Sequence, residues 1–103
     1  MSKKIVFLSG PITGVENYKN AFMAAEVRLE VSGCIVLNPT VLPDDLPDEA
    51  YMPICISMIE QADAIYMLSG WEGSLGAHAE WAYARRQGIQ IVYEKEDEDN
   101  DEY

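Results

Sequence analysis

Four short, mainly apolar runs constrain the fold of this chain more than any other feature. They are Lys4–Leu8, Cys34–Leu37, Ala64–Leu68 and Ile89–Tyr93. Continuous apolar residues, in place of an alternating pattern, are typical of strands buried on both faces of a parallel sheet. Segments long enough for a helix separate each run from the next. The sequence therefore predicts one α/β domain in which every connection between strands is a right-handed parallel crossover.

The expected helices cover about residues 19–32, 51–61 and 75–87. Ser74 stands where the N-cap of the third helix would lie, and Gly88 ends that helix. Asn17 or Asn20 can cap the first helix. Pro53 fits only the first turn of the second helix, because proline lacks the N–H that the helix interior needs.

The predicted fold is a three-layer α/β/α sandwich around a parallel sheet of the flavodoxin or Rossmann-like kind. We expect the strand order to be about 2-1-3-4, which places the topological switch point between the first and third strands. Open sheets of this kind bind ligands at the switch point, beyond the carboxyl ends of the strands. The two glycine-bearing loops, 9–14 and 69–76, should meet there. This coincidence indicates a shared small-molecule site.

Composition limits the partners. The net charge of the 103 residues is −11, and residues 94–103 hold seven acids against one lysine. We expect residues 1–93 to form the domain and 94–103 to be a disordered acidic tail, for which a solubilising role is favoured over binding. The domain shows no basic patch, so binding to a nucleic acid duplex is disfavoured. A free nucleotide stays possible, because backbone amides can hold a phosphate.

The same reading favours a cytoplasmic protein without a membrane partner. No run of 18 apolar residues is present, and the apolar part of the N-terminus is short for a signal peptide. The chain has one histidine, His78, and two cysteines, Cys34 and Cys55, without CxxC spacing. A metal site is therefore not expected, and a reduced, buried cysteine pair is the favoured interpretation.

Glu80 is the main candidate for chemistry. It lies among alanines and aromatic residues in a helix that we expect to be buried almost all round, where a carboxylate is rare. No lysine or arginine stands three or four residues away to pair with it. It follows Ser74 by six residues, which would let its side chain face the predicted pocket. The alternative is a partly exposed carboxylate in a subunit interface.

The candidate binding residues come from three loops. The first strand runs into Ser9-Gly10-Pro11-Ile12-Thr13-Gly14, where glycines allow close approach of a ligand and hydroxyls donate hydrogen bonds. A turn without any ligand is about equally consistent with this pattern. Asn38 follows the second strand and begins a long loop, to about Ala50, that is either functional or simply exposed. Trp71 would stack on a base or pack on a neighbouring helix or subunit. Tyr18 is a further candidate.

The motifs LSGPITG, LNP, ADAIYMLSGWEGSLGAHAEWAYA and GIQIV together resemble the nucleoside 2-deoxyribosyltransferase-like superfamily. The likeness spans residues 4 to 93 and is greatest for small bacterial and bacteriophage members of unassigned function. It implies that Glu80 attacks the anomeric carbon of a nucleoside or nucleotide. It also implies that Ser74 and Gly76 contact a 5′-phosphate and that the loop from Ser9 to Gly14 lines the site. The resemblance implies no metal or organic cofactor. It does imply a homodimer or larger homo-oligomer in which a neighbouring subunit completes the pocket.

One position departs from that pattern. Active relatives carry a second acid about eight residues before the aspartate that opens the third strand, and here this position is Cys55. A thiol cannot replace a carboxylate in moving a proton or positioning hydroxyls. A substitute acid would have to come from Asp44, Asp45, Asp48 or Glu49. The chain is thus predicted to be an N-glycosidic bond hydrolase or 2-deoxyribosyltransferase. The alternatives are an inactive nucleotide-binding module or a bacteriophage-encoded interaction protein.

Overall fold

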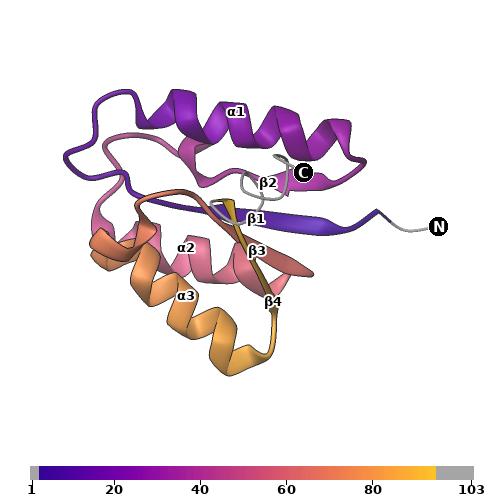
Figure 1. Cartoon of the computed structure of the whole chain (residues 1–103). Helices are drawn as coiled ribbons and strands as arrows, with labels where there is room; N and C mark the ends of the chain where they lie inside the picture. Colours follow the sequence, from indigo (N-terminus) through magenta and orange to yellow (C-terminus); the bar gives the residue numbers. More distant parts are fainter. Residues whose placement is uncertain (1–2, 95–103) are drawn as a thin grey trace.

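Four parallel strands form one sheet in the order β2-β1-β3-β4 (Figure 1). The structure is a computed structural model that describes residues 3–94. The strands are β1 (Ile5–Ser9), β2 (Ile35–Leu37), β3 (Ala64–Met67) and β4 (Gln90–Tyr93). β1 is central and pairs with β2 on one side and with β3 on the other. This order confirms the predicted switch point between the first and third strands.

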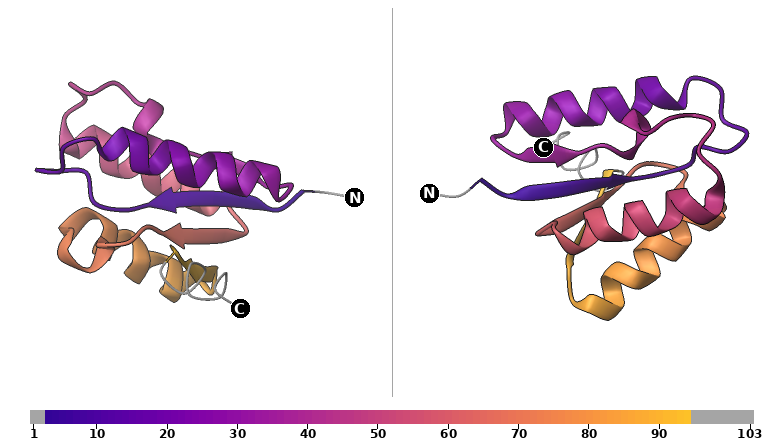
Figure 2. Two further views of the ribbon diagram at one scale, coloured as in Figure 1. Left: turned by 45° about the horizontal axis from the view of Figure 1, so that its top comes forward. Right: turned by 180° about the vertical axis from the view of Figure 1, so that it is seen from behind.

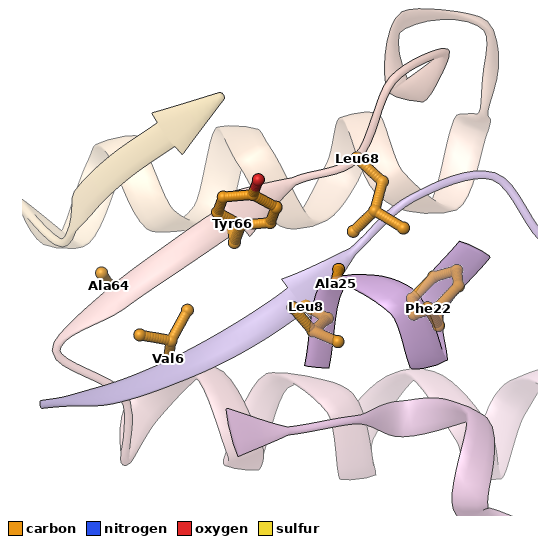
Figure 3. Close-up of a cluster of buried hydrophobic side chains, with 7 residues drawn as sticks. All are labelled: Val6, Leu8, Phe22, Ala25, Ala64, Tyr66 and Leu68. Carbon is orange, nitrogen blue, oxygen red and sulfur yellow. The ribbon is translucent and has the colours of Figure 1, made fainter. Parts of the chain in front are cut away.

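Helices cover both faces of the sheet. α1 (Tyr18–Val31) lies on one face, and α2 (Asp48–Glu60) and α3 (Leu75–Gln87) lie on the other (Figures 1 and 2). The core is accordingly divided, since successive residues of a strand point to opposite faces. Figure 3 shows the cluster on the α1 side, made of Val6, Leu8, Phe22, Ala25, Ala64, Tyr66 and Leu68. The cluster on the other side consists of Phe7, Cys55, Ile59, Ile65, Met67, Ala77 and Ala84. The predicted three-layer α/β/α fold is therefore confirmed.

The second helix begins earlier than the sequence suggested. Pro47 is the N-cap of α2, and Asp48 and Glu49 occupy its first turn. Acidic side chains stabilise that end of a helix by interacting with its dipole. Pro53 consequently lies inside the helix, so its expected place in the first turn was wrong. The preceding connection is shorter than predicted and includes a short 3-10 helix, Pro39–Val41.

The helix ends follow local chemistry only in part. Ser74 caps α3 as predicted, since its Oγ accepts a hydrogen bond from the Ala77 N–H at 3.2 Å. Gly88 ends α3 in the left-handed conformation, with φ of 74°. Asn17 stands at the N-cap of α1, but its side chain makes no capping bond. The expectation that α3 is buried almost all round was wrong, because only three of its side chains are buried: Ala77, Glu80 and Ala84.

Glu94 belongs to the fold, although we assigned it to the tail. Its carboxylate accepts hydrogen bonds from the Ser69 N–H and from Arg28, each at 2.8 Å. The rest of the predicted acidic tail lies outside the described residues. Both cysteines are free, but Cys34 is only half-buried, whereas Cys55 is fully buried. Within residues 3–94, no helix is long and apolar enough to cross a membrane.

We predict that Gly10→Ala destabilises the fold through one close contact. A Cβ at position 10 would lie 2.8 Å from the Cβ of Leu68, which is buried on the neighbouring segment. Overpacking of this kind costs about 1–3 kcal/mol. At Gly73 a Cβ meets nothing within 4 Å, so Gly73→Ala should change stability by less than about 0.5 kcal/mol. Urea denaturation measures both variants, and equal effects would contradict this account.

Candidate active site

A cavity of about 1060 Å³ opens beyond the carboxyl end of β1. Its walls come from the loop after β1, the start of α1, the connection between β2 and α2, the first turns of α2, and the start of α3. Segments far apart in the sequence thus converge at the switch point of the sheet. This is the place where open α/β sheets bind small molecules.

Seven of the ten predicted site residues line this cavity. They are Ser9, Gly10, Pro11, Thr13, Ser74, Gly76 and Glu80. The two glycine-bearing loops therefore do share one cavity. Tyr18, the further candidate, lines it as well. The structure thus places the predicted carboxylate and the predicted hydroxyl groups around a single space.

The other three predicted residues, Gly14, Asn38 and Trp71, do not line the cavity. Gly14 is an exposed turn residue with φ of 76° and is not part of the cavity wall. Asn38 is buried, but its amide donates to Glu26 at 2.9 Å and its oxygen accepts from the Thr40 N–H and hydroxyl. Asn38 therefore holds the backbone after β2, and its neighbours Pro39 and Thr40 line the cavity in its place. Asn38, a candidate binding residue from the sequence, therefore does not offer its amide to the cavity.

Trp71 lies in an aromatic cluster. Its ring centroid is 5.6 Å from that of His78, 5.2 Å from that of Trp81 and 6.0 Å from that of Tyr93. It is not among the residues of the cavity wall. Of the two interpretations of Trp71, packing on a neighbouring helix is the one that the structure supports. His78 also belongs to this cluster.

Glu80 is buried at the base of the cavity. It is 6% exposed, and its Oε1 accepts a hydrogen bond from the Ser9 Oγ at 2.6 Å. Ser9 is the last residue of β1 and is itself buried. The Cys55 thiol, fully buried on α2, shares a second hydrogen bond with the Glu80 carboxyl. Three elements of the fold, β1, α2 and α3, therefore hold this one side chain.

Burial sets the ionisation of this cluster. It raises the pKa of Glu80 to about 7, although the hydrogen bonds from Ser9 and Cys55 act in the opposite direction. Burial also raises the pKa of the Cys55 thiol to about 12, and the nearby Glu80 charge adds to this effect. The pKa of Tyr51, which neighbours Cys55, is raised chiefly by burial too. At neutral pH, Glu80 is thus the group of the three that titrates, and the other two are protonated donors.

Two of the four acids proposed as substitutes line the cavity, namely Asp44 and Asp48. Asp45 and Glu49 do not. Asp44 pairs with Lys19 at 3.0 Å, and the hydrogen bond from Lys19 lowers the pKa of the Asp44 carboxyl. Asp48 lies in the first turn of α2, not in the loop where we expected it. These acids stand at the rim, whereas Glu80 is buried.

The sequence reading missed Tyr51 and Met52, which line the cavity from α2. Tyr51 precedes Cys55 by four residues, so both side chains lie on one face of a helix. This spacing of four residues could have predicted that Tyr51 and Cys55 share a face, but it indicates the cavity only when the start of α2 is known. No group of three or more histidine, cysteine or acidic side chains within residues 3–94 is arranged to hold a metal ion. The site therefore offers one buried carboxylate, surrounded by hydrogen-bond donors and apolar groups.

The shifted pKa of Glu80 predicts a pH-dependent stability. The folded state retains a proton that the unfolded chain releases between the ordinary value of 4.5 and about 7. Stability from this group is therefore complete below about pH 4.5 and is lost as the pH rises through 7. Glu80→Gln removes the titration, so its stability relative to wild type should rise by roughly 3 kcal/mol between pH 4 and 8. Denaturant unfolding across this range measures the difference.

Glu72→Gln, at an exposed position, is the matched control and should follow the wild-type pH dependence. Parallel curves for wild type and Glu80→Gln would show that Glu80 does not titrate in this way.

Comparison with known proteins gives a family but no activity. No curated protein matches the chain in sequence. A family model described as "Domain of unknown function (DUF4406)" matches residues 4–93. The resemblance to nucleoside 2-deoxyribosyltransferases thus remains a prediction. Since the match spans all four strands and all three helices, the chain belongs to the DUF4406 family.

Proposed function

We propose that this protein cleaves the N-glycosidic bond of a nucleoside or nucleotide, with Glu80 as the nucleophile. The observation that carries the proposal is the buried Glu80 carboxyl, held by Ser9 at 2.6 Å inside the cavity at the switch point. The two free cysteines suit a reducing compartment, and we place the reaction in the cytoplasm.

A carboxylate suits this reaction because the anomeric carbon develops oxocarbenium character as the bond to the base breaks. A Glu80 oxygen forms a bond to that carbon while the base leaves with the bonding electrons and takes up a proton from water. The product is a glycosyl ester of Glu80. Attack by water then gives hydrolysis, and attack by a second base gives transfer. The Ser9 hydrogen bond fixes the carboxyl at the end of β1 throughout.

The ionisation of Glu80 predicts how the rate depends on pH. A nucleophilic carboxylate must be ionised, and the pKa of Glu80 is about 7 in the free protein. Its ionised fraction therefore increases as the pH rises through 7, and kcat/KM should increase with it. Cys55 does not compete for this role, because its thiol remains protonated in that range.

The proton that the leaving base takes up comes from water, because Glu80 is the one buried carboxyl of residues 3–94 that lines the cavity. Cys55 occupies the expected position, but a thiol with a pKa of about 12 donates a hydrogen bond without releasing its proton. Asp44 is paired with Lys19, which stabilises its ionised form. Asp48 lines the same cavity and makes no ion pair among the described residues. We assign Asp48 the role of orienting the base or the sugar hydroxyls.

We expect the wild-type protein to release free base from at least one member of a panel of nucleosides and 5′-monophosphates. Glu80→Gln should reduce the rate by about a thousand-fold or more, because a neutral amide cannot form the glycosyl ester. Glu72→Gln, at an exposed position that does not line the cavity, should retain the wild-type rate. Chromatographic detection of base measures all three. Absence of release by wild type, or equal release by Glu80→Gln, would exclude the proposal.

A nucleotide-binding module without catalysis is the second candidate, and the buried Cys55 in place of an acid favours it. It would bind the same ligands, which stabilise the folded state by mass action. The same panel separates the two candidates. A rise in melting temperature without released base indicates binding alone.

The outer face of α1 supports a homo-oligomer. Met23, Val27 and Val31 follow one another at intervals of four residues, so they form a continuous stripe, and they are 53%, 51% and 84% exposed. The opposite face of α1 buries Phe22 and Ala25 in the core. A helix that is apolar on both faces usually has a partner on both.

We propose that a second copy of the chain covers this stripe. The chain carries a net charge of −11, so copies repel each other except where a neutral surface allows contact. The stripe itself is uncharged, with Lys19 beside one end and Glu30 beside the other. In an antiparallel pair of α1 helices centred on Val27, Met23 of each copy lies opposite Val31 of the other, so the two apolar stripes match. An uncharged, apolar stripe that matches its own copy therefore favours a symmetric dimer.

Val27→Glu should give a monomer, because it places like charges at the centre of the symmetric contact. Val41→Glu is the matched control, since Val41 is 75% exposed but belongs to the 3-10 helix after β2 and not to the stripe on α1. Analytical ultracentrifugation at micromolar concentrations measures the mass. A monomeric wild type, or dissociation caused equally by both variants, would count against the stripe as an interface.

A further inference from the structure

The proposed function leaves open whether the substrate carries a phosphate, and the charges around the cavity address this. We propose that the cavity selects uncharged nucleosides and discriminates against their 5′-monophosphates. This inference rests on the proposed function. It also departs from the phosphate contact that the resemblance implied for Ser74 and Gly76.

The charged side chains that line the cavity all carry the same sign. They are Asp44, Asp48 and Glu80, and no lysine, arginine or histidine of residues 3–94 lines the cavity. Lys19 contacts the cavity-lining Asp44, but this contact occupies its Nζ, which lies 3.0 and 3.1 Å from the two carboxylate oxygens. A phosphate dianion would therefore enter a space of negative potential without a cationic side chain to pair with it.

The remaining basic residues of the described chain lie outside the cavity wall. Lys3 precedes β1, and His78 belongs to the aromatic cluster around Trp71. Lys4 is near the start of β1, the edge opposite the cavity, and donates to Gln90. Arg28 donates to Tyr66 and Glu94. Arg85 lies over the Trp81 ring at 4.8 Å, and it shares the last turn of α3 with Arg86. That turn is the far end of the helix whose first turn lines the cavity. None of these cations is placed to serve a phosphate.

The neutral groups of the cavity suit a nucleoside. The hydroxyls of Ser9, Thr13 and Ser74 can pair with sugar hydroxyls, while the apolar wall includes Ile12 and Leu75 and can contact the flat face of a base. Among the backbone N–H groups in the first turn of α3, that of Ala77 is not available to a phosphate, because it donates to the Ser74 Oγ. Hydroxyl donors and an apolar wall bind uncharged ligands without an ionic partner.

A phosphate near Glu80 would also oppose the chemistry. A second negative charge favours the protonated form of a carboxyl, and burial already raises the pKa of Glu80 to about 7. A bound dianion would therefore reduce the ionised fraction at neutral pH. An uncharged nucleoside has no such effect, and it leaves the nucleophile ionised in a larger share of the molecules.

The test compares each common ribonucleoside and 2′-deoxyribonucleoside with its own 5′-monophosphate, by kcat/KM and by calorimetric binding. We expect the nucleoside to be favoured by at least about ten-fold, with a smaller ratio at high salt, because salt screens the repulsion. Leu75 is 92% exposed and lines the cavity at the first position of α3. Leu75→Lys should improve use of the monophosphate by about ten-fold, since it adds the missing cation.

Leu75→Gln is the matched control, because it removes the same apolar side chain without adding charge, and its nucleoside-to-monophosphate ratio should equal that of wild type. A monophosphate bound or cleaved as well as its nucleoside would overturn this inference and leave the proposed function standing. If no nucleoside and no monophosphate is bound or cleaved, both are overturned.

Discussion

The hydrogen bond from Ser9 to Glu80 joins the two halves of this small fold. It connects the last residue of the central strand to a helix 71 residues later in the sequence, at 2.6 Å and in a buried environment. Removing a carboxyl from water is unfavourable unless hydrogen bonds replace the lost solvent. Ser9 and Cys55 provide those bonds, and their effect on the pKa of Glu80 is smaller than the opposing effect of burial. The site is thus poised between a neutral and an ionised carboxyl.

The order of the strands explains why a cavity lies beside this bond. β1 and β3 are neighbours in the sheet, and the helices that follow them, α1 and α3, cover opposite faces, so the segments that leave β1 and β3 diverge above the strands. The divergence begins only after this point, because the Leu68 N–H still donates to the Ser9 carbonyl at 2.8 Å. Gly10 follows at a position where a Cβ would collide with Leu68. The base of the cavity thus forms where the segments that follow β1 and β3, in close contact up to Ser9 and Leu68, begin to separate.

The sequence was informative where local signals decide the structure. The apolar runs predicted all four strands, and Ser74 with Gly88 predicted both ends of α3. The sequence was misleading where a residue distant in the chain determines how a side chain is placed. Asn38 ends a strand at the correct edge, but its amide is bound to Glu26 on α1. Trp71 belongs to a glycine-bearing loop, but three rings outside the cavity hold it. The start of α2 was predicted too late, because Pro53 was taken to mark the first turn. The acids Asp48 and Glu49, which favour the N-terminal end of a helix, indicate the earlier start that the structure shows.

Cys55 is the residue whose meaning changes most between sequence and structure. From the pattern alone it is a missing acid, which would argue against catalysis. In the structure its thiol is fully buried against Glu80 and is protonated at neutral pH. Two carboxyls at such close range would compete for one proton, and one of them would be driven far from its ordinary pKa. A thiol donates a hydrogen bond there without adding a second charge. Compared with the acid that the resemblance implies at this position, Cys55 thus provides no proton-transfer group but allows Glu80, alone, to ionise near neutral pH.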